Sequence, residues 1–271
     1  MKKFCGIILM LPLLLSAGAL RITDSSRGGS SALRNAALEY SLTNGIDIRI
    51  DRMSAKQADM LIPQKTVDIA VYEMNDIPAE LAMAPRIFMG AEVLLLYVHH
   101  TNEVSQITSK EAAEIFTSLR PRWSRYGGNA RTIHRLNLRN TSEHAGLDRD
   151  LFNAPAAAEV LGVNASSDVV HLVSSDPEAL GFAHFSPADE QVKILKVDGI
   201  FPTSSNIMNG RYPLARRYVL VVVKKSQDAE KFVDFLKKDI KNRVRNDMWL
   251  LPEESSLRHS IDKNTNFKKE K

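Results

Sequence analysis

Short apolar runs alternate with amphipathic segments from Leu20 onward, and this alternation limits the fold more than any other feature of the 271 residues. The two longest apolar runs beyond the first twenty residues, 93–98 and 218–223, have six residues each. Runs of this length fit strands that are covered on both faces of a sheet, and they are too short to cross a bilayer. The sequence therefore predicts an α/β protein with a largely parallel sheet.

The first nineteen residues have the pattern of a secretory signal. Lys2 and Lys3 precede an apolar stretch, and small residues end the segment at Ala19, where we expect cleavage. The alternative is an uncleaved membrane anchor. Leu20 follows the small residues where a lipid-anchored protein would carry a cysteine, and the single cysteine, Cys5, lies within the segment. We expect a periplasmic or secreted mature protein without disulfides or a cysteine metal site.

Local signals give the positions of several elements. Ser30 or Ser31 can cap a helix that Gly45 ends, and Ser54 and Thr108 each begin a capping box. The apolar stripe at 228–245 predicts a final amphipathic helix. Further strands are predicted at 20–23, 46–50, 67–71, 133–138 and 181–185. Residues 252–271 are polar, with little to bury, and are predicted to form a flexible tail.

Small hydroxyl residues gather at three strand-to-helix junctions. They are Ser25 and Ser26, then Ser54, then Thr141 and Ser142. In open α/β sheets the ligand crevice lies at this end of the strands, and helix N-termini there offer N–H groups to an anion. The junctions therefore favour an oxyanion site, and the alternative is that each serine only caps its helix.

Residues 120–139 contain six arginines and no Asp or Glu. This stretch predicts a positive face and an anionic ligand, and the alternative is an ordinary solvated surface. The net charge of the whole chain is only +4, which does not indicate nucleic-acid binding.

Catalytic motifs are absent from the sequence. It has no G-x-S-x-G, no H-E-x-x-H and no G-x-x-x-x-G-K-[ST], and the histidines are spread without ligand spacing. We therefore expect no enzymatic activity, no metal and no cofactor.

Several segments together resemble the phosphate-binding proteins of bacterial ABC phosphate transporters. Residues 202–216, P-T-S-S-N-I-M-N-G-R-Y-P-L-A-R, are similar to the family's P-T-x-x-N-I-x-x-G-x-Y-P-L-x-R segment. Weaker resemblances lie at 114–128, at the D-I-A strand 68–70 and at the turn 176–182. Together they cover most of residues 20–225.

The resemblance implies the type II periplasmic-binding-protein fold, with two α/β lobes and two crossing strands between them. The signal peptide would be 1–19, lobe 1 would be 20–97 with 218–251, and lobe 2 would be 98–217. The buried runs at 93–98 and 218–223 would be the crossings, and ligand would be clamped between the lobes.

The resemblance also implies a set of ligand-binding residues. By position in the family's motifs they are Ser25, Ser26, Ser54, Tyr72, Arg139, Thr141 and Ser142. The family's glycines are absent from the loops at Ser54 and Thr141.

The first interpretation is a monomeric extracytoplasmic solute-binding protein that captures phosphate or a related oxyanion for an ABC permease. The second, which the missing glycines favour, is a degenerate relative that keeps the fold but acts as a structural or sensory partner in an envelope complex. A third, enzymatic use of the fold would need an acid/base pair such as Glu73 with a histidine.

Overall fold

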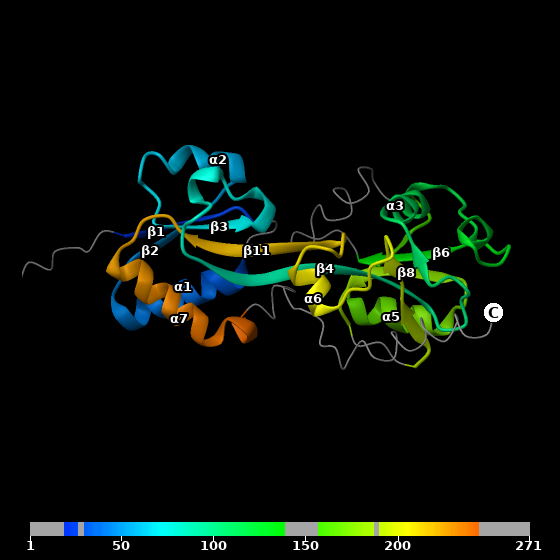
Figure 1. The fold of residues 1–271 in the computed structure, drawn as a ribbon. Coiled ribbons are helices and arrows are strands. Elements are labelled where there is room, and N and C mark those ends of the chain that lie inside the picture. Colours follow the sequence, from blue (N-terminus) through cyan, green and yellow to red (C-terminus); the bar gives the residue numbers. More distant parts are fainter. Residues whose placement is uncertain (1–18, 27–29, 139–156, 187–189, 244–271) are drawn as a thin grey trace, which may run out of the picture.

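One sheet runs through the whole described molecule. The structure is a computed structural model, and it describes residues 19–26, 30–138, 157–186 and 190–243. Within these ranges the sheet has nine strands in the order β2-β1-β3-β11-β4-β8-β6-β7, with β9 paired to β4. Helices cover both faces at each end of the sheet, so the chain forms two α/β lobes (Figure 1).

The first lobe is built on three parallel strands, β1 (Leu20–Asp24), β2 (Ile48–Arg52) and β3 (Ile69–Glu73). One face carries α1 (Ser31–Asn44) and α7 (Gln227–Arg243), and the other carries α2 (Ala55–Leu61) (Figure 1). Tyr40 of α1 and Phe232 of α7 meet edge to face, with ring centroids 5.4 Å apart. The C-terminal helix therefore completes the core of the N-terminal lobe.

Strands β4 (Arg86–His99) and β11 (Ala215–Val222) are antiparallel and connect the lobes, and we refer to them as the crossing strands. β11 pairs with β3 of the first lobe, whereas residues 94–98 of β4 pair with β8 of the second. The apolar run at 93–98 predicted only the second half of β4. Its first half includes Arg86, Gly90 and Glu92, which interrupt the apolar pattern.

The second lobe contains the parallel strands β6 (His134–Leu138), β7 (Leu161–Val163) and β8 (Ala179–His184). Helices α3 (Ser109–Thr117) and α5 (Ser166–Ser175) lie on opposite faces (Figure 1). The short elements are β5 (Gln106–Ile107), β9 (Val192–Ile194), β10 (Lys196–Val197), η3 (Trp123–Tyr126) and α6 (Ser204–Met208).

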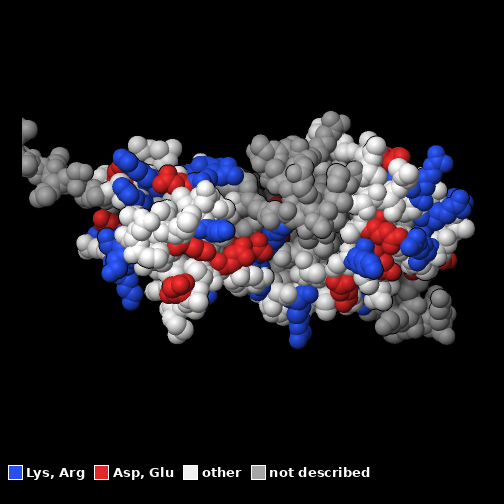
Figure 2. Space-filling view, turned by 90° about the horizontal axis from the view of Figure 1, so that it is seen from above, with Lys and Arg blue, Asp and Glu red and all other residues white. Residues whose placement is uncertain are grey.

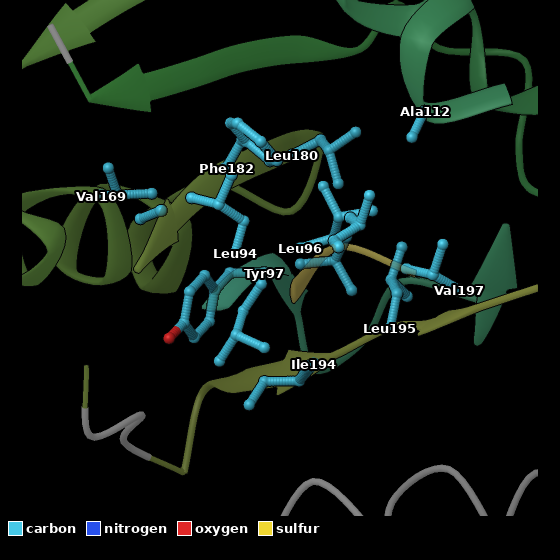
Figure 3. Close-up of a cluster of buried hydrophobic side chains, with 14 of the residues drawn as sticks. Leu94, Leu96, Tyr97, Ala112, Val169, Leu180, Phe182, Ile194, Leu195 and Val197 are labelled. Carbon is cyan, nitrogen blue, oxygen red and sulfur yellow. The ribbon is translucent and has the colours of Figure 1, made fainter. Parts of the chain in front are cut away.

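Side chains from β4, β8 and α5 form the core of the second lobe (Figure 3). Gly181 of β8 allows α5 to pack closely against the strand. A Cβ atom at Gly181 would lie 2.4 Å from Cγ1 of Val169 and 2.8 Å from Cγ2 of Val173, both on α5. Helix α5 therefore packs directly on the backbone of β8, and this contact sets the distance between the helix and the sheet.

Most local predictions are confirmed. Ser30 caps α1, Gly45 ends it at φ +68°, and Ser54 and Thr108 form capping boxes. The strands predicted at 20–23, 46–50, 67–71, 133–138 and 181–185 begin within two residues of the observed ones. The crossing strands β4 and β11 begin seven and three residues before the predicted apolar runs, and α7 begins at Gln227, one residue before its predicted start. Residues 1–18 and 244–271, which hold most of the predicted signal peptide and all of the predicted tail, lie outside the described residues. No helix of the described ranges is long and apolar enough to cross a membrane.

Candidate functional site

The parallel strands of both lobes have their carboxyl ends near the middle of the molecule, where the crossing strands pass from one lobe to the other (Figure 1). In the first lobe, Asp24 at the end of β1 pairs in register with Arg52 of β2 and Val71 of β3. In the second lobe, β6 runs parallel to β8, whose last residue, His184, pairs with Leu94 of β4. Ligands of open α/β sheets bind beyond the carboxyl ends of the strands. The region between the two sets of strand ends, which we call the interlobe site, is therefore the candidate functional site.

A buried carboxylate organises the loop between β1 and α1. Asp24 is 1% exposed, and its carboxylate accepts hydrogen bonds from the backbone N–H of Ser26 (3.0 Å), from the Ser26 hydroxyl (2.5 Å) and from the N–H of Ser30 (2.8 Å). The neighbouring Ser25 hydroxyl donates to the carbonyl of Val71 (2.5 Å) and ties β1 to β3. These donors of Ser25, Ser26 and Ser30 are therefore directed at protein acceptors within the lobe.

Ser54 lies at the N-terminus of α2 and is exposed. Its hydroxyl donates to Oε1 of Gln57 (2.9 Å), and its backbone N–H donates to the same oxygen (3.0 Å). In return the Ser54 hydroxyl accepts from the N–H of Gln57 (3.3 Å). The capping function proposed for this serine is thus present, and a ligand at Ser54 would have to displace the Gln57 side chain.

Tyr72 is fully buried on the α2 side of β3, in a small core with Ala58 and Val219. Its hydroxyl donates to Oδ1 of Asp59 on α2 (2.9 Å). Burial raises the pKa of the Tyr72 hydroxyl, and the carboxylate of Asp59 raises it further, so this group stays protonated and bound to α2. Tyr72 therefore packs in the core of the first lobe with its hydroxyl bound to α2, and the ligand role that the resemblance implied for it stays a prediction.

The other predicted ligand residues, Arg139, Thr141 and Ser142, lie outside the described residues. The structure describes the strand that leads to them. β6 ends at Leu138, and its neighbour β8 ends beside the crossing strands. The described strands that precede the predicted residues, β1 to β3 in the first lobe and β6 in the second, therefore end in the same region (Figure 1).

A line of polar side chains follows one face of the sheet across the interlobe site. In register, Arg216 of β11 lies opposite Glu92 of β4, and Tyr218 lies opposite Glu73 of β3. Nε of Arg216 lies 3.9 Å from Glu73, and the Tyr218 hydroxyl donates to Oε2 of Glu92 (3.3 Å). Nε2 of His184 on β8 lies 4.0 Å from Oε1 of Glu92.

Sequence reasoning missed this polar line. Glu92 is 8% exposed and His184 is 2% exposed, so both are buried polar groups of the kind that require partners. The signal available in the sequence was a single acid, Glu92, directly before the predicted buried strand 93–98.

The segment that carried the strongest resemblance holds the crossing strands in place. Thr203 caps α6, and the side-chain amide of Asn206 donates to the carbonyl of Phe201 (2.9 Å). The Tyr212 hydroxyl donates to the carbonyl of Leu94 on β4 (2.8 Å). Gly210 has φ +75°, and a Cβ atom there would lie 2.7 Å from the guanidinium of Arg217. The residues of the motif thus make contacts within the segment itself and with the crossing strands β4 and β11.

The arginine-rich stretch is less positive than predicted, because several of its guanidinium groups have partners in the described part of the chain. Arg125 pairs with Glu114 (2.8 Å) and Arg131 with Glu178 (3.6 Å). Arg135 is 4% exposed and donates to carbonyls at the end of α3, and burial lowers the pKa of its guanidinium. Figure 2 shows basic and acidic side chains side by side at this end of the molecule.

A hollow of about 690 Å³ in the second lobe does not suit an oxyanion. Its lining includes Glu103, Glu111 and Asp198, whose charge would repel an anion. The carboxylates of Glu111 and Asp198 accept hydrogen bonds from Thr108 and Ser109, so they stabilise the start of α3. Within the described ranges, no three His, Cys, Asp or Glu side chains are grouped so that they could hold a metal ion.

Comparison with known proteins finds relatives that are named as phosphate-binding proteins. No protein-family model matches the chain. The phosphate-binding protein PstS of Bacillus subtilis is 28% identical over 153 residues, 55% of this chain and 51% of that protein. The phosphate-binding protein PstS of Borreliella burgdorferi is 21% identical over 260 residues, 87% of this chain and 93% of that protein. The chain therefore matches about half the length of the Bacillus relative and nearly all of the Borreliella relative.

Solved structures share the fold. An ABC-type phosphate transport receptor from Vibrio cholerae superposes with a TM-score of 0.63 at 18% identity, over 86% of this chain and 100% of that one. These matches confirm the predicted resemblance to phosphate-binding proteins, and they confirm the two-lobed α/β fold.

Proposed function

We propose that this chain captures inorganic phosphate or a related small oxyanion between its lobes and delivers it to an ABC permease, with no chemical step of its own. The observation that carries the proposal is the convergence of the strand ends of both lobes on the crossing strands. The similarity to proteins named phosphate-binding supports the class of ligand. A clamp of this kind needs hydrogen-bond donors from two sides and no nucleophile or base.

In this proposal the second lobe supplies most of the binding free energy. Arg139, Thr141 and Ser142 would follow β6 and present a guanidinium and hydroxyls to the anion. In the first lobe the donors of Ser26 and Ser30 already bind Asp24, so Ser25, Ser26 and Ser54 would contribute less. Tyr72 is left out of the proposed site because its hydroxyl binds Asp59.

Isothermal titration with phosphate and sulfate tests the proposal. Arg139→Ala is expected to weaken phosphate binding by one to a few powers of ten, because each charge-assisted hydrogen bond contributes about 1.5–3 kcal/mol. Arg139→Lys is expected to recover part of the loss, since a point charge cannot form two parallel bonds. The exposed Arg122 provides the control, Arg122→Ala, with a small effect that disappears in high salt. Unchanged affinity in Arg139→Ala with intact circular dichroism would contradict the proposed site.

A second function, a structural or sensory partner in an envelope complex, is favoured by one observation. The buried carboxylate of Asp24 takes up N–H groups that a phosphate would otherwise receive in the first lobe. No change in thermal stability with phosphate, sulfate or other small oxyanions would favour this second function, because a ligand at one hundred times its dissociation constant adds about 2.7 kcal/mol.

The proposal includes an extracytoplasmic location. Residues 1–19 would be removed as a signal peptide, and the mature protein would act as a monomer with lobes 20–97 plus 218–251 and 98–217. N-terminal sequencing of the protein from the cell envelope is expected to begin at Leu20, and retention of Met1 in the membrane fraction would contradict the location.

A further inference from the structure

The described sheet ends at β2, which pairs with β1 and has no second partner strand among the described residues. Met53, directly after β2, donates its N–H to the carbonyl of Asp24 on β1 (3.2 Å). Successive residues of a strand point their backbone groups to opposite edges, so the N–H and C=O groups of Ile48, Ile50 and Arg52 point away from β1. They form an open edge to which another strand can add.

Opposite charges lie on either side of the central residue of this edge, Ile50. Arg49 precedes it and Asp51 follows it, and both are exposed. Since side chains alternate along a strand, both lie on the face opposite to Ile48 and Ile50, which pack against the core that α1 and α7 cover. The strand is therefore complementary in charge to its own reverse.

This complementarity fits an antiparallel pair of identical strands. If two copies of β2 pair with Ile50 opposite Ile50, the outward N–H and C=O groups of these residues exchange hydrogen bonds. Arg49 then lies opposite Asp51, twice by the two-fold symmetry, at positions where cross-strand side chains are closest. A centre at residue 49 or 51 would place identical charges opposite each other, and a centre at Ile48, the first residue of β2, would extend the pairing beyond the strand.

The alternative is that these charges prevent edge pairing, as charged side chains on edge strands often do. That protection requires a charge that a second copy cannot neutralise, whereas here each copy supplies the opposite charge. In the described part of the chain Asp51 has no ion-pair partner, and Arg49 has only Asp47, at 3.4 Å, with both side chains at least 60% exposed. Neither charge is therefore committed to a strong contact within the chain.

Helix α1, which contacts β2, adds exposed apolar surface beside this edge. Leu38 and Leu42 lie one turn apart and are 62% and 78% exposed. Glu39 binds Arg243 of α7, and a rotation of about 100° per residue places Leu38 on a different side of α1 from α7. A stable interface buries about 1,200–2,000 Å², more than a short strand pair provides, so we expect weak, reversible pairing to which these leucines contribute.

We propose that two copies of this chain pair edge to edge through β2, in an antiparallel two-fold arrangement with Arg49 of each copy opposite Asp51 of the other. The sheet would then continue from one first lobe into the next. β1 and β3 separate β2 from the crossing strand β11, so each copy keeps its own interlobe site and a single chain remains the unit that binds a ligand. The pairing therefore goes beyond the proposed function and does not depend on it.

Sedimentation equilibrium of the purified protein, from about 1 µM to about 1 mM, tests the pairing. The wild type is expected to approach twice the mass of one chain at high concentration. Arg49→Asp and Asp51→Arg each place like charges opposite each other twice, so each alone is expected to raise the dissociation constant of the pair at least about tenfold. An equimolar mixture of the two variants restores both opposite-charge pairs and is expected to associate as a heterodimer. Arg211→Asp is the matched control, because it makes the same charge change at an exposed residue outside the first lobe.

A wild type that keeps the mass of one chain at about 1 mM would overturn the proposal. Association of either single variant as strong as that of the wild type would overturn it too, because another surface would then be paired, and so would a mixture that does not associate. Circular dichroism checks that each variant folds. If one single variant fails to fold, the double variant Arg49→Asp/Asp51→Arg decides, because it exchanges the two charges and is expected to associate like the wild type. Phosphate affinity is expected to be equal in all variants, so loss of pairing and loss of ligand binding are separate outcomes.

Discussion

Asp24→Asn tests whether the buried carboxylate holds the first loop together. Asp24 has both carboxylate oxygens engaged, Oδ1 with the N–H and hydroxyl of Ser26 and Oδ2 with the N–H of Ser30. In the asparagine variant an NH₂ group replaces one of these oxygens. If it replaces Oδ2, the N–H of Ser30 faces another donor in a place where Ser30 is 0% exposed.

The expected loss in the free energy of unfolding follows from the hydrogen bonds that change. A hydrogen bond to a charged group contributes about 1.5–3 kcal/mol. The loss of negative charge near the N-terminus of α1 removes about 0.5 kcal/mol more. We therefore expect Asp24→Asn to lower the free energy of unfolding by about 2–3.5 kcal/mol. That is a large part of the stability of an ordinary domain.

The assay is urea unfolding followed by circular dichroism at pH 7. Asp47→Asn is the control, because Asp47 is 60% exposed and pairs only with Arg49 at 3.4 Å in the described structure, so its loss is expected to cost less than about 0.5 kcal/mol. A loss below about 0.5 kcal/mol in Asp24→Asn would refute the reasoning. Phosphate affinity is measured alongside. A carboxylate repels an oxyanion bound at this loop, so the variant is expected to bind more tightly, and equal affinity would indicate that the ligand lies elsewhere.

Three further predictions concern single sites. Gly181→Ala forces a methyl group against Val169 and Val173, so the free energy of unfolding is expected to fall by about 1–3 kcal/mol, and an unchanged urea midpoint would contradict the close packing of α5. Tyr72→Phe removes the hydrogen bond to Asp59, so stability is expected to fall by about 1 kcal/mol while phosphate affinity stays unchanged, and weaker binding would restore Tyr72 to the site. The hydrogen bond from Arg243 lowers the pKa of Glu39 below its ordinary value of 4.5, so the stabilisation is complete above that value and is lost as the pH falls through the lowered pKa. The stability difference between wild type and Glu39→Gln is therefore expected to be larger at pH 7 than at pH 3, and an equal difference at both would contradict the pairing.

Elements with local signals were the predictable part of the fold. Ser30, Ser54 and Thr108 cap helices through bonds to residues three positions along the chain, so sequence spacing alone is sufficient. Helix α5 was missed because its N-cap position is Ala165, which has no capping side chain, and its sequence is rich in valine and serine. The strands β5 and β10 were missed because each has two residues and is held by its partner.

The site was less predictable, because its residues are defined by contacts between distant segments. Tyr72 lies in a strand that is buried on both faces, so alternation could not show on which side its hydroxyl would lie. Asp24 looks like an ordinary loop acid in the sequence, and only the folded loop brings the N–H groups of Ser26 and Ser30 to it. The pairing of Glu92 with Tyr218 joins residues 126 positions apart.

The segment that carries the strongest resemblance to phosphate-binding proteins also contacts the crossing strands, so it bears on the fold more directly than on the ligand. The contacts of this segment are made within the protein. Asn206 donates to the carbonyl of Phe201, Tyr212 donates to the carbonyl of Leu94 on β4, and Gly210 adjoins the guanidinium of Arg217 on β11. None of these contacts requires a ligand. The motif can therefore hold the connection between the lobes whether or not a ligand binds. The ligand-facing loops are under a separate constraint, because a buried acid such as Asp24 can replace the anion as acceptor of the loop N–H groups while the fold stays intact. Phosphate binding by this chain must consequently be decided by measurement at Arg139 and Asp24, since the motif at 202–216 would be present in either case.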